Sequence, residues 1–558
     1  MMAERKCRSV LIHINDSIPS PRALRLVLAF LLLLTGTVSP SWADAPALDR
    51  LYPPAIATGK ISAVTAEGKF PTWPVEIFCD RVDLAVTCEA ENGRLSVNAT
   101  QATVPGVAWI RFSDTQGASN LVPLLIETRP VVAEIEPNDT VSESMNVPLP
   151  TTLAGRLEKS GDVDCYQVEL PANGSLHARL IGKQILNSGM DAVMQLVDAH
   201  GNVLLQSDDE VGIDPQLVYT TKQAQEVHLR VFAFPETPNS TIGFAGSPAF
   251  CYTLQLSTQP TIDHFLPLVH SPALQPVAYD TQLNAHAATL FGATQSSPAV
   301  AYSQTAWQWS PRVAVEDCDA ILELADKTQT ATRLPLLFSG HISLPGESDS
   351  VRFPAVARKK LRAQVISRQH GFPLDSVVEI IDPANGEVIA RGDDAGRNDY
   401  DAQLDFTPKT DGELELRISD LAGSASLRHA YSVLLAEVVP AVKLTIDTDH
   451  FTIQPGASLE IGIGITRQDG FDQTLEVTAT DLPDGVAVSP VVSEPKGDSA
   501  KTVKLKLLAE ESVPPKHCQF RIQATIKNAA NASPMHATYS LRPTVDTHVF
   551  WLTVSRAD

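Results

Sequence analysis

The sequence has little positive charge, and it lacks the short motifs that mark most enzyme classes. Of its 558 residues, 43 are Lys or Arg and 65 are Asp or Glu, which gives a net charge of −22. Non-specific nucleic-acid binding needs clustered positive charge to displace phosphate counterions, so that class is excluded. No His-Glu-x-x-His, Gly-x-Ser-x-Gly or Gly-x4-Gly-Lys motif occurs. These absences predict a protein that is not an enzyme.

Long apolar runs are also missing. The most apolar stretch, residues 26–34, is far shorter than the roughly 20 residues that span a bilayer. Arg22 and Arg25 precede it, and Ser41-Trp42-Ala43 offers small residues for cleavage before Asp44. This pattern is typical of a secretory signal over residues 1–43, with an uncleaved anchor as the alternative. We expect export to the periplasm, cell surface or medium, with no membrane span in the mature chain.

Cysteine is scarce, and its spacing excludes a zinc knuckle. Six cysteines follow the signal: Cys79, Cys88, Cys165, Cys251, Cys318 and Cys518. Export permits disulfides. Cys79 and Cys88 fall on adjacent strand-like runs, and Cys165 and Cys251 open two similar segments, so both pairs are predicted to be bonded. A third pair would follow only by elimination.

Period-two alternation of apolar and polar residues recurs along the chain, for example at 176–180, 227–231, 414–418, 459–463 and 503–507. Such alternation predicts strands with one buried face. Turn sequences such as Asn-Gly and Pro-Asp-Gly separate them, and no long amphipathic helix is indicated. The predicted fold class is all-β, as tandem β-sandwich or jelly-roll domains.

An internal repeat divides the chain. Several residues recur 185 positions later: Gly155, Gly161, Asp164, Gly201, Asp208, Asp209 and Asp214 become Gly340, Gly346, Asp349, Gly386, Asp393, Asp394 and Asp399. Asp191 and Asp198 recur at Asp375 and Asp382 after 184 positions. The repeat predicts two copies of one module, at residues 131–260 and 311–438. A strand-rich unit of this size is expected to be a sandwich or jelly roll.

Each module carries short motifs of its own. The first copy has Glu-Ile-Glu-Pro-Asn-Asp at 134–139 and Gly-Asp-Val-Asp-Cys-Tyr at 161–166. The second has Pro-Leu-Asp-Ser-Val at 373–377 and Asp-Asp-Ala-Gly at 393–396. With these motifs both modules resemble bacterial pre-peptidase C-terminal domains, which are related to the collagen-binding domains of clostridial collagenases. The resemblance implies secreted jelly-roll modules.

The flanking regions resemble immunoglobulin-like domains. Residues 44–130 are similar to a small β domain found in exported planctomycete proteins, and residues 439–558 to a bacterial immunoglobulin-like fold. Residues 261–310, rich in Pro, Ala, Ser and Gln, are either a linker or a truncated β domain.

The start of the first module is the candidate metal site. An extended Glu-x-Glu-x-Asn-Asp segment places Glu134, Glu136 and Asn138 on one side, with Asp139 at the following turn. Asp162 and Asp164 would complete an oxygen shell for Ca²⁺, which prefers six to eight oxygens. The resemblance also implies calcium, because related collagen-binding domains use such a segment. The alternative is a capped turn with solvated carboxylates.

The second module departs from this pattern, because its corresponding region is Glu-Asp-Cys-Asp at 316–319, with Glu347 and Asp349 in the loop. The sequence leaves open whether this module binds calcium. The Asp-Asp pairs at 208–209 and 393–394 are expected to be turn residues.

Together these features favour a non-enzymatic, calcium-stabilised, exported protein that is associated with the envelope and recognises an extracellular protein or polysaccharide. One alternative is an accessory subunit of a secreted protease or other hydrolase that acts in trans. Another is an enzyme with its active site in the jelly-roll loops.

Overall fold

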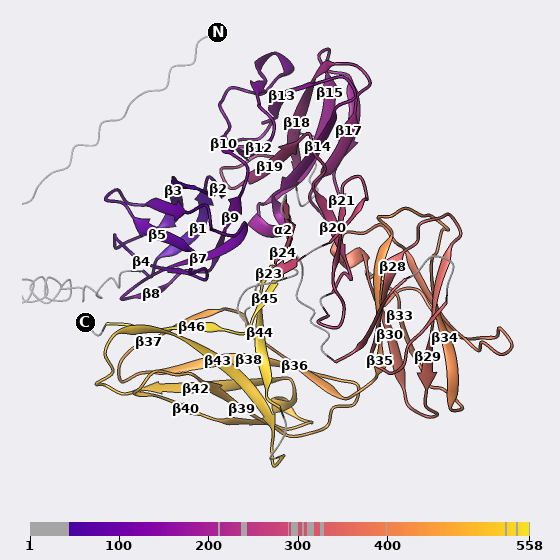
Figure 1. The fold of residues 1–558 in the computed structure, drawn as a ribbon. Coiled ribbons are helices and arrows are strands. Elements are labelled where there is room, and N and C mark those ends of the chain that lie inside the picture. Colours follow the sequence, from indigo (N-terminus) through magenta and orange to yellow (C-terminus); the bar gives the residue numbers. More distant parts are fainter. Residues whose placement is uncertain are drawn as a thin grey trace, which may run out of the picture. The chain divides into compact units, whose positions relative to one another are not determined.

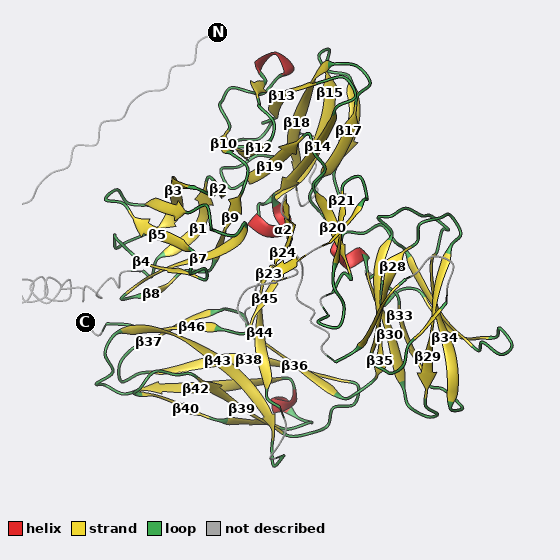
Figure 2. Cartoon of the chain, in the orientation of Figure 1, coloured by secondary structure: helices red, strands yellow, loops and turns green. Residues whose placement is uncertain are grey.

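The computed structural model of the chain consists almost entirely of β-strands and turns, which confirms the predicted all-β fold class (Figures 1 and 2). The described residues are 44–556, except 210–212, 236–242, 270, 288, 292–299, 304–305, 310–316, 324–327, 398, 530–532 and 543–544. The predicted secretory signal, residues 1–43, lies outside them. Within them the α-helix α2 (Lys183–Leu186) is a single turn, and no helix has the length and hydropathy to cross a membrane.

The first β region forms two sheets around one core. The strand orders are β1-β3-β6-β5 and β2-β9-β7-β4, with β8 beside β7. The strands are β1 (Ala47–Tyr52), β2 (Ala55–Ala57), β3 (Lys60–Lys69), β4 (Glu76–Cys79), β5 (Leu84–Cys88), β6 (Arg94–Ala99), β7 (Gly106–Asp114), β8 (Gly117–Ala118) and β9 (Val122–Glu127). On β6, Leu95 and Val97 are buried while Arg94 and Asn98 are exposed, as period-two alternation requires. Leu95 packs with Ile110 and Leu124 of the other sheet.

The first module of the repeat is a sandwich of two five-stranded sheets, ordered β10-β12-β19-β14-β17 and β11-β13-β18-β15-β16. The strands are β10 (Val131–Ala133), β11 (Met145–Asn146), β12 (Thr151–Arg156), β13 (Asp164–Leu170), β14 (Ser175–Ile181), β15 (Met190–Asp198), β16 (Val203–Ser207), β17 (Gln216–Thr220), β18 (Gln225–Pro235) and β19 (Cys251–Ser257). Leu153 and Leu180 of one sheet share a core with Leu196 and Leu229 of the other.

The second module repeats this topology, with sheets ordered β26-β28-β35-β30-β33 and β27-β29-β34-β31-β32. The strands are β26 (Asp319–Leu322), β27 (Gln329–Thr330), β28 (Leu336–His341), β29 (Ser348–Ala355), β30 (Leu361–Ile366), β31 (Ser376–Ile381), β32 (Val388–Gly392), β33 (Gln403–Phe406), β34 (Gly412–Asp420) and β35 (Ala430–Glu437). Each strand has a counterpart in the first module, so the repeat seen in the sequence is a repeat of structure.

One pairing within the repeat is corrected by the structure. Asp214 accepts hydrogen bonds from the backbone N–H groups of residues 182–184, at the turn that opens α2. In the second module the carboxylate with this role is Asp401, which accepts from the N–H groups of residues 367–369. The sequence comparison had matched Asp214 with Asp399, because it assumed a constant displacement through a loop that differs in length.

The described residues between 261 and 309 include six short strands, which form two small sheets. The strands are β20 (Ile262–Leu266), β21 (Val277–Asp280), β22 (Ala285–Ala287), β23 (Thr289–Phe291), β24 (Val300–Ser303) and β25 (Ala306–Trp309). Leu266, Leu268 and Val269 pack against Leu337 and Ile366 of the second module. Residues 266–269 are therefore held by apolar burial on that module.

The last β region has eleven strands around one core that includes Leu475, Leu505, Phe520 and Phe550. They are β36 (Ala441–Thr445), β37 (His450–Ile453), β38 (Ser458–Gln468), β39 (Leu475–Thr480), β40 (Val486–Ser489), β41 (Val491–Ser493), β42 (Thr502–Ala509), β43 (Lys516–Ile526), β44 (Met535–Arg542), β45 (Val545–Thr547) and β46 (Phe550–Val554). On β42 buried and exposed residues alternate strictly.

The six cysteines of the described residues form no disulfide in the structure, so the predicted pairs are not observed. Cys165 packs with Val193 and Phe232 on the outer side of its sheet, whereas Cys251 lies in the other sheet, opposite Arg156. Because the sandwich core separates these two surfaces, the similarity of the two Cys-Tyr segments does not bring their cysteines together.

Candidate metal centre

The candidate metal centre lies where the chain enters the first module. Strand β10 pairs in parallel with β12, and directly after it the Glu134 N–H donates to the Ala154 carbonyl at 3.0 Å. The segment then continues to Glu136 and Asn138, whose carbonyl accepts from the Cys165 N–H at 2.9 Å. This second bond holds the segment against the start of β13, where Asp164 is the first residue.

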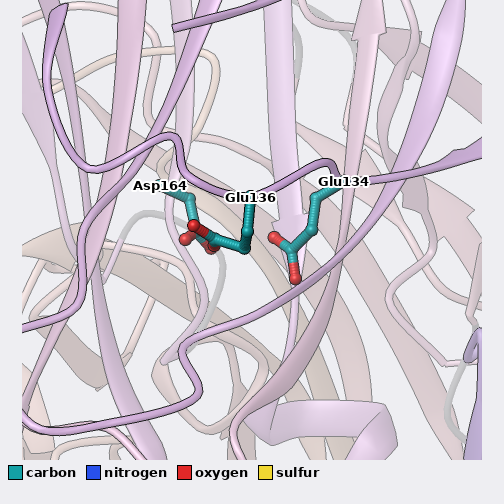
Figure 3. A group of neighbouring side chains, drawn as sticks. All are labelled: Glu134, Glu136 and Asp164. Atoms are coloured by element: carbon teal, nitrogen blue, oxygen red, sulfur yellow. The ribbon is translucent and has the colours of Figure 1, made fainter. Parts of the chain in front are cut away.

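Three carboxylates converge at this point. Glu134, Glu136 and Asp164 each place an oxygen within 4.8 Å of the others. Figure 3 shows the carboxylate of Glu136 beside that of Asp164, with Glu134 next to them. Glu134 is partly buried and Asp164 fully buried, whereas Glu136 is exposed. The cluster therefore has one side open to solvent, from which a hydrated cation can enter.

The other three predicted ligands also lie at this entrance. Asp162 is in the turn before β13, where Gly161 has φ +88° and so takes a left-handed conformation that favours glycine. One Asp162 oxygen accepts from the backbone N–H groups of Glu158 and Lys159. The Asn138 N–H donates to a Glu136 oxygen at 3.1 Å. Of the six residues that the sequence singled out, Glu134, Glu136 and Asp164 form the cluster, and Asn138, Asp139 and Asp162 lie on the same two segments.

Several polar atoms here are buried without a hydrogen-bond partner, which is unusual in a folded protein. They are Asn138 Oδ1 and Nδ2, Asp139 Oδ1, Asp162 Oδ1 and Asp164 Oδ1. The exposed fraction is 0% for Asn138, 1% for Asp162 and 0% for Asp164. Leaving such atoms unpaired costs about 1–3 kcal/mol each. A cation that accepts their lone pairs would remove this cost for the oxygens.

Two tyrosines support the cluster from the core side, and the sequence analysis did not identify them as part of the site. The Tyr166 hydroxyl donates to Glu134 at 3.1 Å, and the hydroxyls of Tyr166 and Tyr252 lie 2.6 Å apart. The Tyr252 hydroxyl also donates to Asp164. The sequence shows only that both tyrosines belong to similar Cys-Tyr segments. It does not show the contacts, because these join residues that are 86 and 88 positions apart.

Burial and mutual repulsion make ionisation of the cluster costly. Burial raises the pKa of Glu134 to about 8, and the negative charge of Glu136 adds to the rise. Burial and the nearby Glu134 raise the pKa of Asp164 well above its usual range. Burial, with Asp139 beside it, also raises the pKa of Asp162. Protons therefore occupy part of the site unless a cation balances the charge.

These donors fit calcium better than a softer metal. Carboxylate and amide oxygens suit Ca²⁺, while the thiolate and imidazole ligands that favour zinc or copper do not belong to the cluster. Glu134, Glu136, Asn138, Asp139, Asp162 and Asp164 would hold the ion. A bound divalent cation would supply positive charge that offsets the repulsion among these groups.

The second module holds a related cluster of three carboxylates, Glu323, Glu347 and Asp349, again within 4.8 Å of one another. Glu323 follows β26 as Glu134 follows β10, and its N–H donates to the Ser339 carbonyl at 2.8 Å. Glu347 replaces Asp162 and accepts from the N–H groups of Ser343 and Leu344.

The counterpart of Glu134 is Glu323 and does not lie at residues 316–319, where the sequence predicts it. Glu316 lies outside the described residues. Asp317 forms an ion pair with Arg333, with oxygen and nitrogen 2.8 Å apart, and Asp319 accepts from both the N–H and the hydroxyl of Thr332. Both carboxylates therefore have partners of their own, outside the cluster.

The Asp-Asp pairs lie outside both clusters. Asp208 follows β16 and accepts from the N–H of Asp209 at 3.0 Å, and Asp393 accepts from the N–H of Asp394 at 2.9 Å. All four residues are exposed. These bonds are local turn contacts, as the sequence predicted.

No protein-family profile and no curated protein matches the sequence. Among solved structures, 22% of the chain aligns with 95% of the pre-peptidase C-terminal domain of collagenase from Bacillus anthracis, at 13% identity and TM-score 0.16. Fibronectin(III)-like modules of Clostridium thermocellum CbhA align over 36% of this chain and 88% of theirs, at 14% identity and TM-score 0.13. SGBP-B of Bacteroides uniformis, from a xyloglucan utilization locus, aligns over 39% of this chain and 74% of its own, at 11% identity and TM-score 0.15. Likenesses this distant identify no function for the chain.

Proposed function

We propose that the chain is a non-enzymatic, exported binding protein whose first module is stabilised by calcium. The observation that carries the proposal is the set of buried carboxylate and amide oxygens without partners at Asn138, Asp139, Asp162 and Asp164, beside the carboxylates of Glu134 and Glu136. A cation bound there links the segment that enters the module to the turn before β13. Because the ion binds the folded state alone, it raises stability by mass action.

The binding partner is proposed to be an extracellular protein or polysaccharide, with the chain in the periplasm, at the cell surface or in the medium. Two features support a binding role. The predicted secretory signal precedes the β modules, and the sequence carries none of the hydrolase or phosphate-loop motifs sought above. Calcium would keep the entrance of the first module in one conformation, which lowers the entropy cost of recognition by the surfaces nearby.

Calorimetric titration of residues 44–558 with Ca²⁺ tests the metal part of this proposal. We expect saturable binding, and Glu136→Ala should weaken it strongly because a candidate ligand is lost. Glu136 is exposed, so this substitution leaves the core intact. Glu143→Ala is the matched control, because Glu143 is also exposed, lies on the same entrance segment and is outside the cluster. Unchanged calcium affinity in Glu136→Ala would contradict the proposal.

Capture from envelope and medium extracts tests the binding part. The immobilised chain is loaded with calcium, washed, and eluted with a chelator. A saturable partner in the eluate supports calcium-dependent binding and identifies its chemical class. If the folded, calcium-loaded protein retains nothing from either extract, the binding role is rejected.

A further inference from the structure

Exposed apolar side chains form two runs of consecutive residues in the described part of the chain. Val203, Leu204 and Leu205 are 52%, 36% and 37% exposed, and Val388 and Ile389 are 46% and 42% exposed. The other large exposed apolar residues stand singly along the sequence, from Ile61 to Leu508. Single apolar residues on a surface need no explanation, whereas grouped ones mark interaction sites.

The two runs occupy equivalent places in the repeat. Val203 and Leu204 lie on β16, and Val388 and Ile389 lie on β32, each displaced by 185 positions. Each strand is the last in its five-stranded sheet, so within the described residues its outer backbone groups have no strand partner. An edge strand with apolar side chains is a ready template for another extended chain.

Both strands also carry a β-bulge at the same position. On β16, Leu205 pairs with Leu196 and Val203 with Val197, which leaves Leu204 as the extra residue. On β32, Ala390 pairs with Ile380 and Val388 with Ile381, which leaves Ile389 extra. Bulges usually blunt an edge against indiscriminate pairing. Here the extra residue is itself apolar and exposed, so the bulge adds a contact side chain.

A hollow of about 280 Å³ lies beside β16. Leu205, Leu217 and Leu283 form part of its wall, with Asp263 and Arg428 at its polar part. This hollow is large enough for an apolar side chain of a partner. It gives the β16 edge a depression next to its apolar row.

The acidic residues beside these two strands indicate the charge of the partner. The exposed pair Asp208 and Asp209 follows β16 directly, and Asp393 and Asp394 follow β32. A second copy of this chain would bring its own acidic pairs and net charge of −22 to the contact. Like charges across an interface are unfavourable, so a basic partner fits better. Neither strand carries an aromatic residue on which a sugar ring could stack, which favours a protein over a polysaccharide.

We propose that β16 is the docking strand for an extended segment of a partner protein, in which apolar side chains lie next to basic residues. Strand β32 is the equivalent second site, and binding there would not use the hollow, which lies beside β16. The proposal rests on the binding role proposed above and specifies its partner class and surface. The two acidic turns would bind the basic residues, while the apolar row and the hollow hold the side chains of the segment.

The test uses residues 44–558 saturated with calcium and a fluorescent ten-residue peptide that alternates valine and threonine and ends in two lysines. Binding is measured by fluorescence polarisation in low salt. Saturable binding is expected, and combining Leu204→Lys with Ile389→Lys should weaken it by about tenfold or more, because lysine on an edge strand opposes pairing. Leu508→Lys is the matched control, since Leu508 is 42% exposed on β42 of the last β region. It should bind as the unaltered chain does.

Four results would overturn the docking proposal: no binding, equal weakening by Leu508→Lys, equal binding of a peptide ending in two glutamates, or self-association that Leu204→Lys abolishes. The last would make a second copy the occupant. Calcium titration of every variant keeps the two proposals separate. If the unaltered chain binds calcium but not the peptide, the docking proposal alone is rejected. If the unaltered chain does not bind calcium, the metal site is rejected.

Discussion

The two modules share one topology, yet their entrances differ in how many buried oxygens lack a hydrogen-bond partner. The first combines six candidate ligands, four of which have buried oxygens without a hydrogen-bond partner. The second gathers Glu323, Glu347 and Asp349, and no buried oxygen of these three residues lacks a hydrogen-bond partner. An acidic cluster alone is thus not a calcium site. The unpartnered oxygens distinguish an incomplete coordination shell from carboxylates that are already satisfied.

The largest expected effect is on calcium affinity. Asp164→Asn should lower it by about 100-fold, because ligand charge is the main determinant of affinity in such sites. The equivalent change, Asp349→Asn, should leave it unaltered. Calorimetry of the unaltered chain should accordingly show one tight site. Two tight sites, or an equal effect of both substitutions, would show that the modules do not differ in this way.

The second-largest expected effect is a change of stability with pH. The pKa of Glu134 rises from 4.5 to about 8 on folding. Between these values the folded chain keeps a proton that the unfolded chain has lost, so the free energy of unfolding falls as pH increases through this range. Calcium replaces the proton, so the stabilisation that it adds should grow over the same range. Hydrogen exchange of β13, with and without calcium, measures this locally.

A calcium effect on β13 that is constant across this pH range would contradict the expected exchange of protons for calcium. Strand β29 is the internal control. The pKa of Asp349 rises to about 7 through burial and the nearby Glu323, so the stability of the second module should also fall with increasing pH. Added calcium should not restore it.

Substitution of Asn138 should have two smaller effects of opposite sign, one on stability and one on calcium affinity. Asn138→Leu removes two buried polar atoms that lack partners, so without calcium the stability of the first module should rise by about 1 kcal/mol. Calcium affinity should fall in the same variant because an amide oxygen is lost. Chemical unfolding in chelator and calorimetry with calcium measure the two effects. A loss of stability without calcium would show that the Asn138 amide already has a partner.

The tyrosines should give the smallest effects. Tyr252→Phe and Tyr431→Phe each remove a hydroxyl that donates to a buried carboxylate, at a cost of about 1–2 kcal/mol. Only the first should also change calcium affinity, by less than about tenfold. Equal calcium affinity in both variants would show that Tyr252 supports the fold but does not position Asp164.

The sequence was sufficient to predict the all-β fold class, because the period-two pattern defines strands directly. It also singled out Glu134, Glu136 and Asp164, which form one cluster in the structure, while calcium binding by the six candidate residues stays a prediction. Tyr166 and Tyr252 could not be predicted, because their contacts depend on which strands become neighbours across the sandwich. Glu323 was missed because it lies 189 positions after Glu134, while the residues that reveal the repeat in the sequence are displaced by 184 or 185. A shift of a few residues in a connecting segment is enough to assign the wrong carboxylate.

The parallel pairing of β10 with β12 has a mechanical consequence. Because β19 is antiparallel to β12 on its other side, with Leu256 opposite Thr151, the chain enters and leaves the module at the same end of this sheet. Tension on the chain would therefore separate β10 from β12 one residue pair at a time. Separation in this way needs less force than sliding one whole strand past the other. Peeling proceeds through Val131, Val132 and Ala133 and then reaches Glu134. A cation there would tie the strand to Asp164, so calcium would set the force at which the module begins to yield.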